Sequence, residues 1–178
     1  MTAAPGQKDD PLIKAADALV ASANIRADAM LVSLLDDYPT LGKVADTKQW
    51  VQISTVAGVF MAAMRLPNLH LEAARENEIM GKLYERFTQW GSASAEPAFE
   101  ECATFFAKNY AELEQAGQVP RLVASEAIGL WVVSKALSRA AQTDAEKQLA
   151  RAIGAMITDS FFDYWETKPG NVEAKLGG

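Results

Sequence analysis

The chain contains a single histidine, His70, and histidine is a side chain commonly used in metal binding and acid–base chemistry. It lies shortly after Pro67 and Asn68 in the sequence. A metal site on one helix face needs further ligands three or four residues away. The residues at those positions have no ligating side chain: Leu66, Pro67, Ala73 and Ala74. We therefore interpret His70 as part of a corner between two helices, with Asn68 as the expected N-cap of the second helix.

Three charged residues fall on helix faces that are otherwise apolar. Glu76 shares a face with Leu83 and Phe87 at helical spacing, and Glu126 and Lys135 lie on a later, strongly apolar segment. A buried carboxylate or ammonium group needs a partner or a shifted pKa. Glu76, Glu126 and Lys135 are therefore candidates for a polar patch that lines a pocket. The alternative is that each side chain lies near a helix end or extends to water.

The sequence contains no recognisable catalytic motif. It has no nucleophile elbow, Walker loop, dinucleotide-binding fingerprint or EF-hand loop, and a ferritin-type diiron site would need two Glu-x-x-His motifs. Cys102 is the only cysteine, so it cannot form an internal disulfide, and its position among aromatic residues predicts a packing role. We expect no metal and no cofactor, and we favour a protein that is not an enzyme. An enzyme whose motif is not recognisable remains a further hypothesis.

Aromatic residues are concentrated near the C-terminus, at residues 161–165. They spread around more than one face of a helix, so one part is expected to pack inward. Phe162 and Trp165 are the candidates for an exposed aromatic patch of the kind that is enriched at protein interfaces. The alternative is that a tail or another helix covers them.

The composition excludes several classes of function. The 178 residues include 17 Lys and Arg against 23 Asp and Glu, which gives a net charge of −6 without a basic cluster. Nucleic-acid binding and a polybasic membrane anchor both require such a cluster. The all-helical pattern resembles that of tetracycline-repressor-type regulators, but the first 50 residues contain no basic helix-turn-helix, so no family is identified.

Neither a secretory signal nor a membrane span is expected. The first ten residues contain no apolar run, which predicts a cytoplasmic protein. The most apolar segment, residues 50–66, has about 17 residues, which is near the lower limit for a span. Gln52, Ser54 and Thr55 interrupt it, so we expect a buried core helix rather than a transmembrane one.

The hydrophobic periodicity predicts an all-α, single-domain bundle of about six helices within residues 10–168. The expected helices span residues 11–38, 47–66, 69–90, 97–116, 120–141 and 144–165. Asp10 with Pro11 begins the first, and Thr143 with Glu146 forms a capping box at the last. The segments 47–66 and 120–141 are apolar nearly all round, which is typical of central helices. Residues 1–9 and 169–178 are expected to be a disordered and a flexible tail.

The two central segments resemble each other. Residues 54–61 and 125–132 have similar sequences, with Gly58 and Gly129 at matching positions. Each lies between two amphipathic helices, which suggests a duplicated three-helix unit in which the glycines allow the central helices to cross closely. The alternative is that two buried helices look alike because both are apolar.

These observations lead to two main hypotheses about function. The first is a non-enzymatic cytoplasmic interaction or adaptor protein that self-associates, with a protein partner or a second copy as its binding partner. The second is a sensor or binding protein for an apolar small molecule, with a pocket between the central helices.

Overall fold

The computed structural model describes residues 10–167, and that part of the chain consists of helices and turns without a strand. The predicted tails lie outside these residues. The six helices are α1 (Pro11–Asp36), α2 (Thr47–Arg65), α3 (Ala73–Gly91), α4 (Ala95–Gln115), α5 (Pro120–Leu137) and α6 (Asp144–Phe161). Three short 3-10 turns lie between the first four helices: η2 (Leu41–Lys43), η3 (Leu66–Leu69) and η4 (Ser92–Ser94). The predicted all-α bundle is confirmed.

Local capping explains where several helices begin. The carboxylate of Asp10 accepts a hydrogen bond from the backbone N–H of Leu12 at 2.8 Å, and Pro11 follows at the first helical position. The carboxylate of Asp46 accepts one from Gln49 at 2.7 Å and caps α2. These bonds satisfy backbone donors that have no partner inside the helix. The capping box at the start of α6 is also confirmed.

Three predicted helix ends differ from the observed ones by about four residues. The third helix begins at Ala73 rather than at residue 69, because η3 comes first and His70 then adopts a left-handed conformation (φ 51°). Helix α5 ends at Leu137 rather than at residue 141, where Ser138 (φ 54°) is also left-handed. Helix α6 ends at Phe161, and a further helical turn, residues 164–167, follows a two-residue turn. A residue with left-handed φ and ψ angles interrupts a right-handed helix because it turns the chain out of the helical path.

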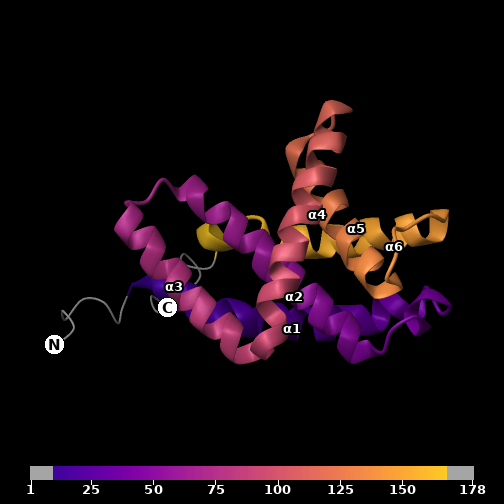
Figure 1. Cartoon of the computed structure of the whole chain (residues 1–178), viewed down its shortest axis with the longest axis horizontal. Coiled ribbons are helices and arrows are strands. Elements are labelled where there is room, and N and C mark those ends of the chain that lie inside the picture. Colours follow the sequence, from indigo (N-terminus) through magenta and orange to yellow (C-terminus); the bar gives the residue numbers. More distant parts are fainter. Residues whose placement is uncertain (1–9, 168–178) are drawn as a thin grey trace, which may run out of the picture.

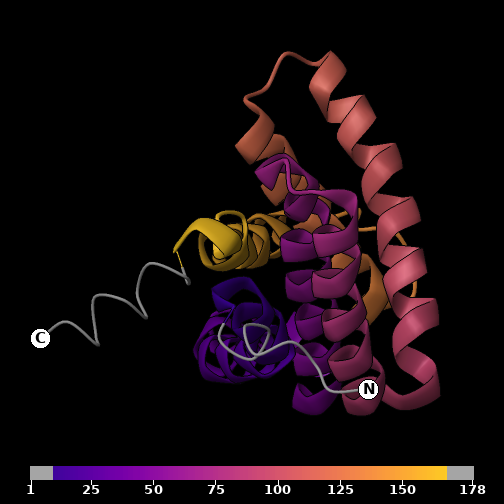
Figure 2. The same cartoon turned by 90° about the vertical axis from the view of Figure 1, so that its left-hand side faces the viewer.

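The helices lie in two main directions. In Figure 2, α1 and α6 are seen nearly end-on, whereas α2 and α3 stand upright beside them. Helix α1 packs against α2 and α3, and α5 packs against α4 and α6. The last turns of α4 and the start of α5 project beyond the other helices in both views (Figures 1 and 2). One surface depression lies between α3 and α4, and another lies beside the segment that joins them.

Helices α2 and α5 form the centre of the core, as predicted. Both are buried on most of their surface, and Trp50 of α2 and Trp131 of α5 are almost completely enclosed. Four phenylalanines from α2, α3 and α4 form a cluster of edge-to-face contacts: Phe60, Phe87, Phe99 and Phe106. Edge-to-face packing of this kind adds to the stabilisation from burial.

The close crossing that the glycines allow is between α5 and α6, not between α2 and α5. A Cβ added to Gly129 would lie 1.8 Å from the carbonyl oxygen of Ala150, and one on Gly154 would lie 1.9 Å from that of Ser125. Gly58 instead faces the ring of Phe161, at 3.0 Å. The two glycines that suggested a repeat therefore have different surroundings, and a duplication is not shown.

Among the described residues, α1 is the one helix that is long and apolar enough to span a membrane by length and composition, whereas the sequence had singled out residues 50–66 as the most apolar segment and predicted a buried core helix there. The core helix of a globular protein passes the same test. One face of α1 is indeed part of the core and includes Leu19, Ala23 and Leu31.

Candidate functional site

His70 lies on the surface, at the end of η3. Its backbone N–H donates to the carbonyl of Pro67 at 3.1 Å, and Asn68 lies inside the 3-10 turn instead of capping α3. Among residues 10–167, no group of three or more His, Cys, Asp or Glu side chains is arranged to hold a metal ion. His70 thus has a role in the corner, although the corner is built differently from the predicted one.

The structure does not bring Glu76, Glu126 and Lys135 together. Glu76 is half-buried in the first turn of α3, where a negative charge interacts favourably with the helix dipole. Glu126 of α5 lies 3.8 Å from Arg151 of α6. Lys135 forms an ion pair with Glu101 of α4. The predicted common polar patch is therefore wrong, and each charge has a local environment of its own.

The two candidate interface aromatics have different surroundings. Phe162 is half-buried, with the guanidinium of Arg65 4.0 Å and that of Arg121 5.2 Å from its ring centre. Trp165 is only 3% exposed, and its indole N–H donates to the carbonyl of Ala62 at 2.7 Å. The prediction that Trp165 is exposed is wrong, because the turn after α6 folds back onto α2.

An apolar depression lies between α3 and α4, and we call it the α3–α4 groove. It has a volume of about 280 Å³, which is large enough for one or two side chains or a small ligand. Its walls come from α3 and α4 and its floor from Val59 of α2. The apolar lining residues are Val59, Met80, Leu83, Phe87 and Phe99.

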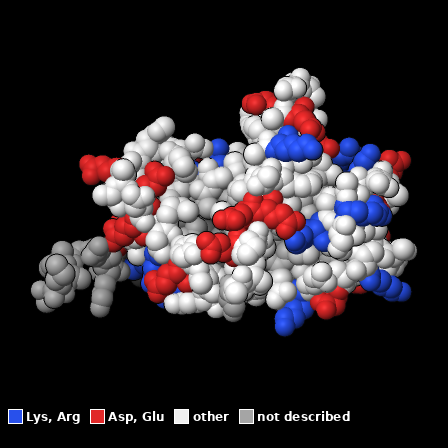
Figure 3. Space-filling model, viewed as in Figure 1, with Lys and Arg blue, Asp and Glu red and all other residues white. Residues whose placement is uncertain are grey.

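The polar residues that line the α3–α4 groove are acidic or neutral. Glu96 and Glu100 of α4 line it together with Tyr84 of α3, and it has no lysine or arginine in its lining. The hydroxyl of Tyr84 donates to the carboxylate of Glu96 at 3.1 Å, which links the two helices across the groove. Figure 3 shows acidic side chains gathered over α4 on the face seen in Figure 1. The groove thus combines an apolar floor with a negative rim.

A second, wider depression of about 1150 Å³ lies where α1, α2, α4 and α5 meet, and we call it the central groove. Its aromatic and aliphatic lining includes Trp90, Trp131 and Val56. The wall formed by α4 and α5 carries the ion pair of Glu101 and Lys135. Further polar groups line it from α1 and α2: Asn24, Asp28, Lys48, Gln49 and Gln52. Of the three charges singled out from the sequence, Lys135 alone lines either groove.

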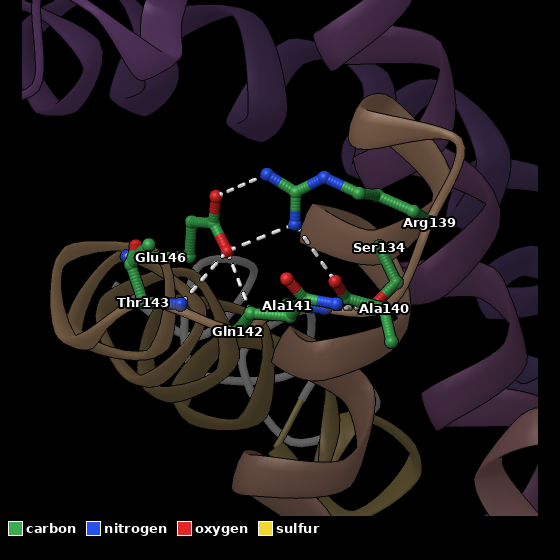
Figure 4. A network of polar contacts seen from close by, with 7 residues as sticks. All are labelled: Ser134, Arg139, Ala140, Ala141, Gln142, Thr143 and Glu146. Atoms are coloured by element: carbon green, nitrogen blue, oxygen red, sulfur yellow. Dashed lines mark hydrogen bonds and ion pairs between the residues drawn. The ribbon is translucent and has the colours of Figure 1, made fainter.

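A network of hydrogen bonds and an ion pair joins the end of α5 to the start of α6 (Figure 4). Arg139 donates to both carboxylate oxygens of Glu146, at 2.6 and 3.2 Å, and the N–H groups of Gln142 and Thr143 donate to Oε2 at 2.6 and 3.0 Å. Arg139, followed by these two N–H groups, lowers the pKa of Glu146 from its usual 4.5 to about 2. The capping box was visible in the sequence, but the contribution of Arg139 depends on the left-handed turn at Ser138.

Comparison with known proteins adds no relative. No protein-family model, curated protein or solved structure matches this chain. The six helices define an all-α domain. Because no known protein matches, its function must be argued from its own residues.

Proposed function

We propose that this chain is a non-enzymatic, cytoplasmic interaction or adaptor protein that binds a partner protein through the α3–α4 groove and that also self-associates. The observation that carries the proposal is the apolar groove itself, which is lined by Met80, Leu83 and Phe99 and is open to solvent. Exposed apolar surface edged by polar groups is typical of sites where proteins bind one another.

The rim of the groove indicates what kind of partner would fit. A large apolar side chain would enter between Met80 and Phe99, while Lys or Arg residues beside it would meet Glu96 and Glu100. An amphipathic helix with basic flanks supplies both features, since its apolar residues recur every three or four positions. Complementary charges would add selectivity and speed of association.

Selection from a library of random displayed peptides tests this proposal. We expect the peptides that bind the full chain to combine a large apolar residue with neighbouring Lys or Arg. The substitution Glu100→Lys should weaken their binding about 10-fold or more, because it places like charges together, which costs over 1 kcal/mol. Fluorescence anisotropy with a labelled peptide measures this change.

The matched control is Glu112→Lys, an exposed acidic residue on the same helix that does not line the groove. It makes the same change in net charge and should leave binding within about twofold, since a distant rim charge contributes little. Equal weakening by both variants would mean that only net charge matters. Peptides that bind the Glu100→Lys variant as well as the wild type would contradict the proposed site.

A second candidate function is the binding of a small apolar molecule in the central groove. It is favoured by the combination of Trp90 and Val56 with Lys135 in one depression. An aromatic ligand with an acidic group could stack on Trp90 and share the ammonium group of Lys135 with Glu101. Such a molecule would make the protein a sensor or carrier rather than an adaptor.

The dye 8-anilinonaphthalene-1-sulfonate has this chemistry and is a direct probe. We expect the affinity of the dye to fall about fivefold or more in Lys135→Gln. This change corresponds to about 1 kcal/mol of binding free energy, which is expected for the loss of one charge-assisted contact. The control is Lys147→Gln on the surface of α6. Binding that is unchanged in Lys135→Gln would exclude this site for the dye.

A further inference from the structure

Helix α1 has an apolar face on the side that points away from the core. Five residues on it are exposed and follow one another at intervals of three, four, four and three: Ala18, Ala21, Ile25, Ala29 and Val32. The buried face of the same helix includes Leu19, Ala23, Ala27 and Leu31. At 100° per residue the two faces lie nearly opposite each other. We call the exposed set the outer face of α1.

This outer face differs from the usual solvent side of a surface helix, which carries charged and polar residues. Ile25 is 66% exposed and Val32 is 53% exposed. In the most apolar 18-residue stretch of α1, only 33% of the residues are buried. The outer face extends for about 21 Å along the axis, and the exposed Asp28 lies at one edge of it, about 60° from Ile25 around the helix.

The outer face is complementary to itself when a second copy is placed antiparallel to it. With the two-fold axis at Ile25, Ala21 faces Ala29 of the other copy and Ala18 faces Val32. Lys14 and Asp36 continue this face at its two ends, and both are exposed. An antiparallel pair brings each Lys14 to the Asp36 of the other copy, whereas a parallel pair would bring like charges together.

We propose that the outer face of α1 is the surface through which two copies of this chain form an antiparallel, two-fold symmetric dimer. This inference deepens the self-association in the proposed function and rests on that part of it. The alanines let the two helices approach closely around the Ile25 side chains. A two-fold interface uses the same patch on both subunits, as this self-complementary face requires.

The size of the face predicts a reversible dimer. A stable interface buries about 800 Å² from each partner, and one pair of helices in contact over about 21 Å supplies only part of that area. We therefore expect the dimer to dissociate on dilution. Sedimentation equilibrium of the full chain over a range of concentrations measures this association.

The substitution Ile25→Glu tests the surface, because it places two carboxylates against each other at the axis. We expect dimerisation to weaken at least about 10-fold, which corresponds to 1.4 kcal/mol. Leu122→Glu is the matched control, since Leu122 is 61% exposed on α5 and lies away from α1. Circular dichroism melting of both variants shows that the fold is kept. Equal weakening by both variants, or none by Ile25→Glu, would overturn the proposal.

Disulfide crosslinking tests the position of the axis. In Ile25→Cys the two new thiols face each other, so mild oxidation should give a covalent dimer that disappears on reduction. Met30→Cys is the control, because Met30 is 40% exposed on α1 but lies off the outer face. The natural Cys102 is buried and does not interfere. Crosslinking through position 30 but not 25 would be inconsistent with the proposed face.

Charge reversal tests the antiparallel direction. Lys14→Glu and Asp36→Lys should each weaken the dimer, and the double variant should restore it, because the opposite charges meet again. If neither the single variants nor the double variant changes the dimer, the helices do not pair in this direction.

A lipid surface is the alternative occupant of the outer face. A chain that stays monomeric at all concentrations, yet co-sediments with phosphatidylcholine–phosphatidylglycerol vesicles unless Ile25 is replaced by Glu, would overturn the dimer in favour of membrane binding. Peptide binding by the α3–α4 groove, measured in the Ile25→Glu variant, separates the two proposals. If the variant still binds the peptide and no dimer is detected, then the interaction function is retained without self-association through α1.

Discussion

At the scale of single residues, Glu146 is held more firmly than any other acidic side chain whose contacts are described above. Its carboxylate accepts four hydrogen bonds and its side chain is only 4% exposed. One of the donors, Arg139, is itself 46% exposed, so solvent screens part of that charge pairing. The backbone N–H donors of Gln142 and Thr143 are fixed by the turn, and their effect does not depend on a flexible side chain.

The pKa of Glu146 predicts how stability depends on pH. Because the folded pKa of about 2 lies below the usual 4.5, ionisation of Glu146 stabilises the fold above pH 4.5. That contribution is lost as the pH falls from 4.5 through about 2. We expect Glu146→Gln to lower the unfolding midpoint at pH 7 and to differ little from the wild type near pH 2. Urea unfolding at several pH values measures the difference.

The control for that series is Glu112→Gln, which removes an exposed carboxylate of α4. It should follow the wild type across the whole pH range. If the difference between Glu146→Gln and the wild type does not shrink below pH 4.5, then the ionised carboxylate is not what stabilises the turn.

Cys102 gives a second prediction at this scale. Its side chain has no exposed surface, and burial, together with the nearby charge of Glu101, raises the pKa of its thiol. The thiolate is the reactive form, so a disulfide reagent should modify the folded protein at least about 100-fold more slowly than the unfolded protein. Absorbance after addition of Ellman's reagent, with and without guanidinium, measures both rates. Rapid reaction in the native state would show that α4 opens readily.

At the scale of elements, the arrangement of α5 and α6 depends on two glycines. Gly129 and Gly154 allow the backbones to touch, since a Cβ at either position would meet a carbonyl oxygen of the other helix at under 2 Å. A backbone cannot move aside as a side chain can. This contact therefore fixes the distance between the two helices, and the network around Glu146 fixes the turn that joins them.

Substitution of Gly129 by alanine should be strongly destabilising. The added methyl group would push α5 and α6 apart, and overpacking of this kind costs about 1–3 kcal/mol or more. Guanidinium unfolding followed by circular dichroism measures the change in free energy.

Two other glycines serve as controls for that experiment. At Gly81 a Cβ meets nothing within 4 Å, so Gly81→Ala in α3 should stabilise the protein by about 0.5–1 kcal/mol through helix propensity. At Gly58 the methyl group would meet the ring of Phe161, which can shift, so we expect a smaller loss than at Gly129. A Gly129→Ala variant as stable as the wild type would contradict the close crossing.

At the scale of the whole molecule, the turn after α6 joins the two ends of the described chain. The hydroxyl of Tyr164 donates to the carbonyl of Ala15 in α1 at 2.8 Å, and Trp165 donates to Ala62 in α2. Both side chains belong to the same buried cluster as the cores of α2 and α5. One connected core of this kind is expected to unfold in a single cooperative transition.

The substitution Tyr164→Phe tests this connection. It removes one buried hydrogen bond, which should cost about 1 kcal/mol while keeping one transition by both near- and far-ultraviolet circular dichroism. Burial raises the pKa of Tyr164 from 10 to about 12, so the protonated form is favoured in the folded state. The wild type should therefore lose stability between pH 10 and 12 relative to Tyr164→Phe. Tyr110→Phe is the control, and an equal effect there would contradict the special role of Tyr164.

Much of the fold could be predicted from the sequence, whereas most of the candidate site could not. The periodicity predicted six helices and the central position of α2 and α5, because burial follows the pattern of apolar residues. The α3–α4 groove was not predicted. Its residues come from three helices, and each looks like an ordinary core or surface residue in its own helix.

The sequence by itself determined the helical class, the caps at Asp10 and Thr143 and the role of Cys102 as a packing residue, because these depend on neighbours in the chain or on simple apolarity. The tertiary structure alone decided which charges meet and which aromatic residues are covered. Lys135 pairs with Glu101 across two helices, and Trp165 is buried because the chain folds back after α6. Such contacts join residues far apart in sequence, and their geometry is set by the packing of whole helices.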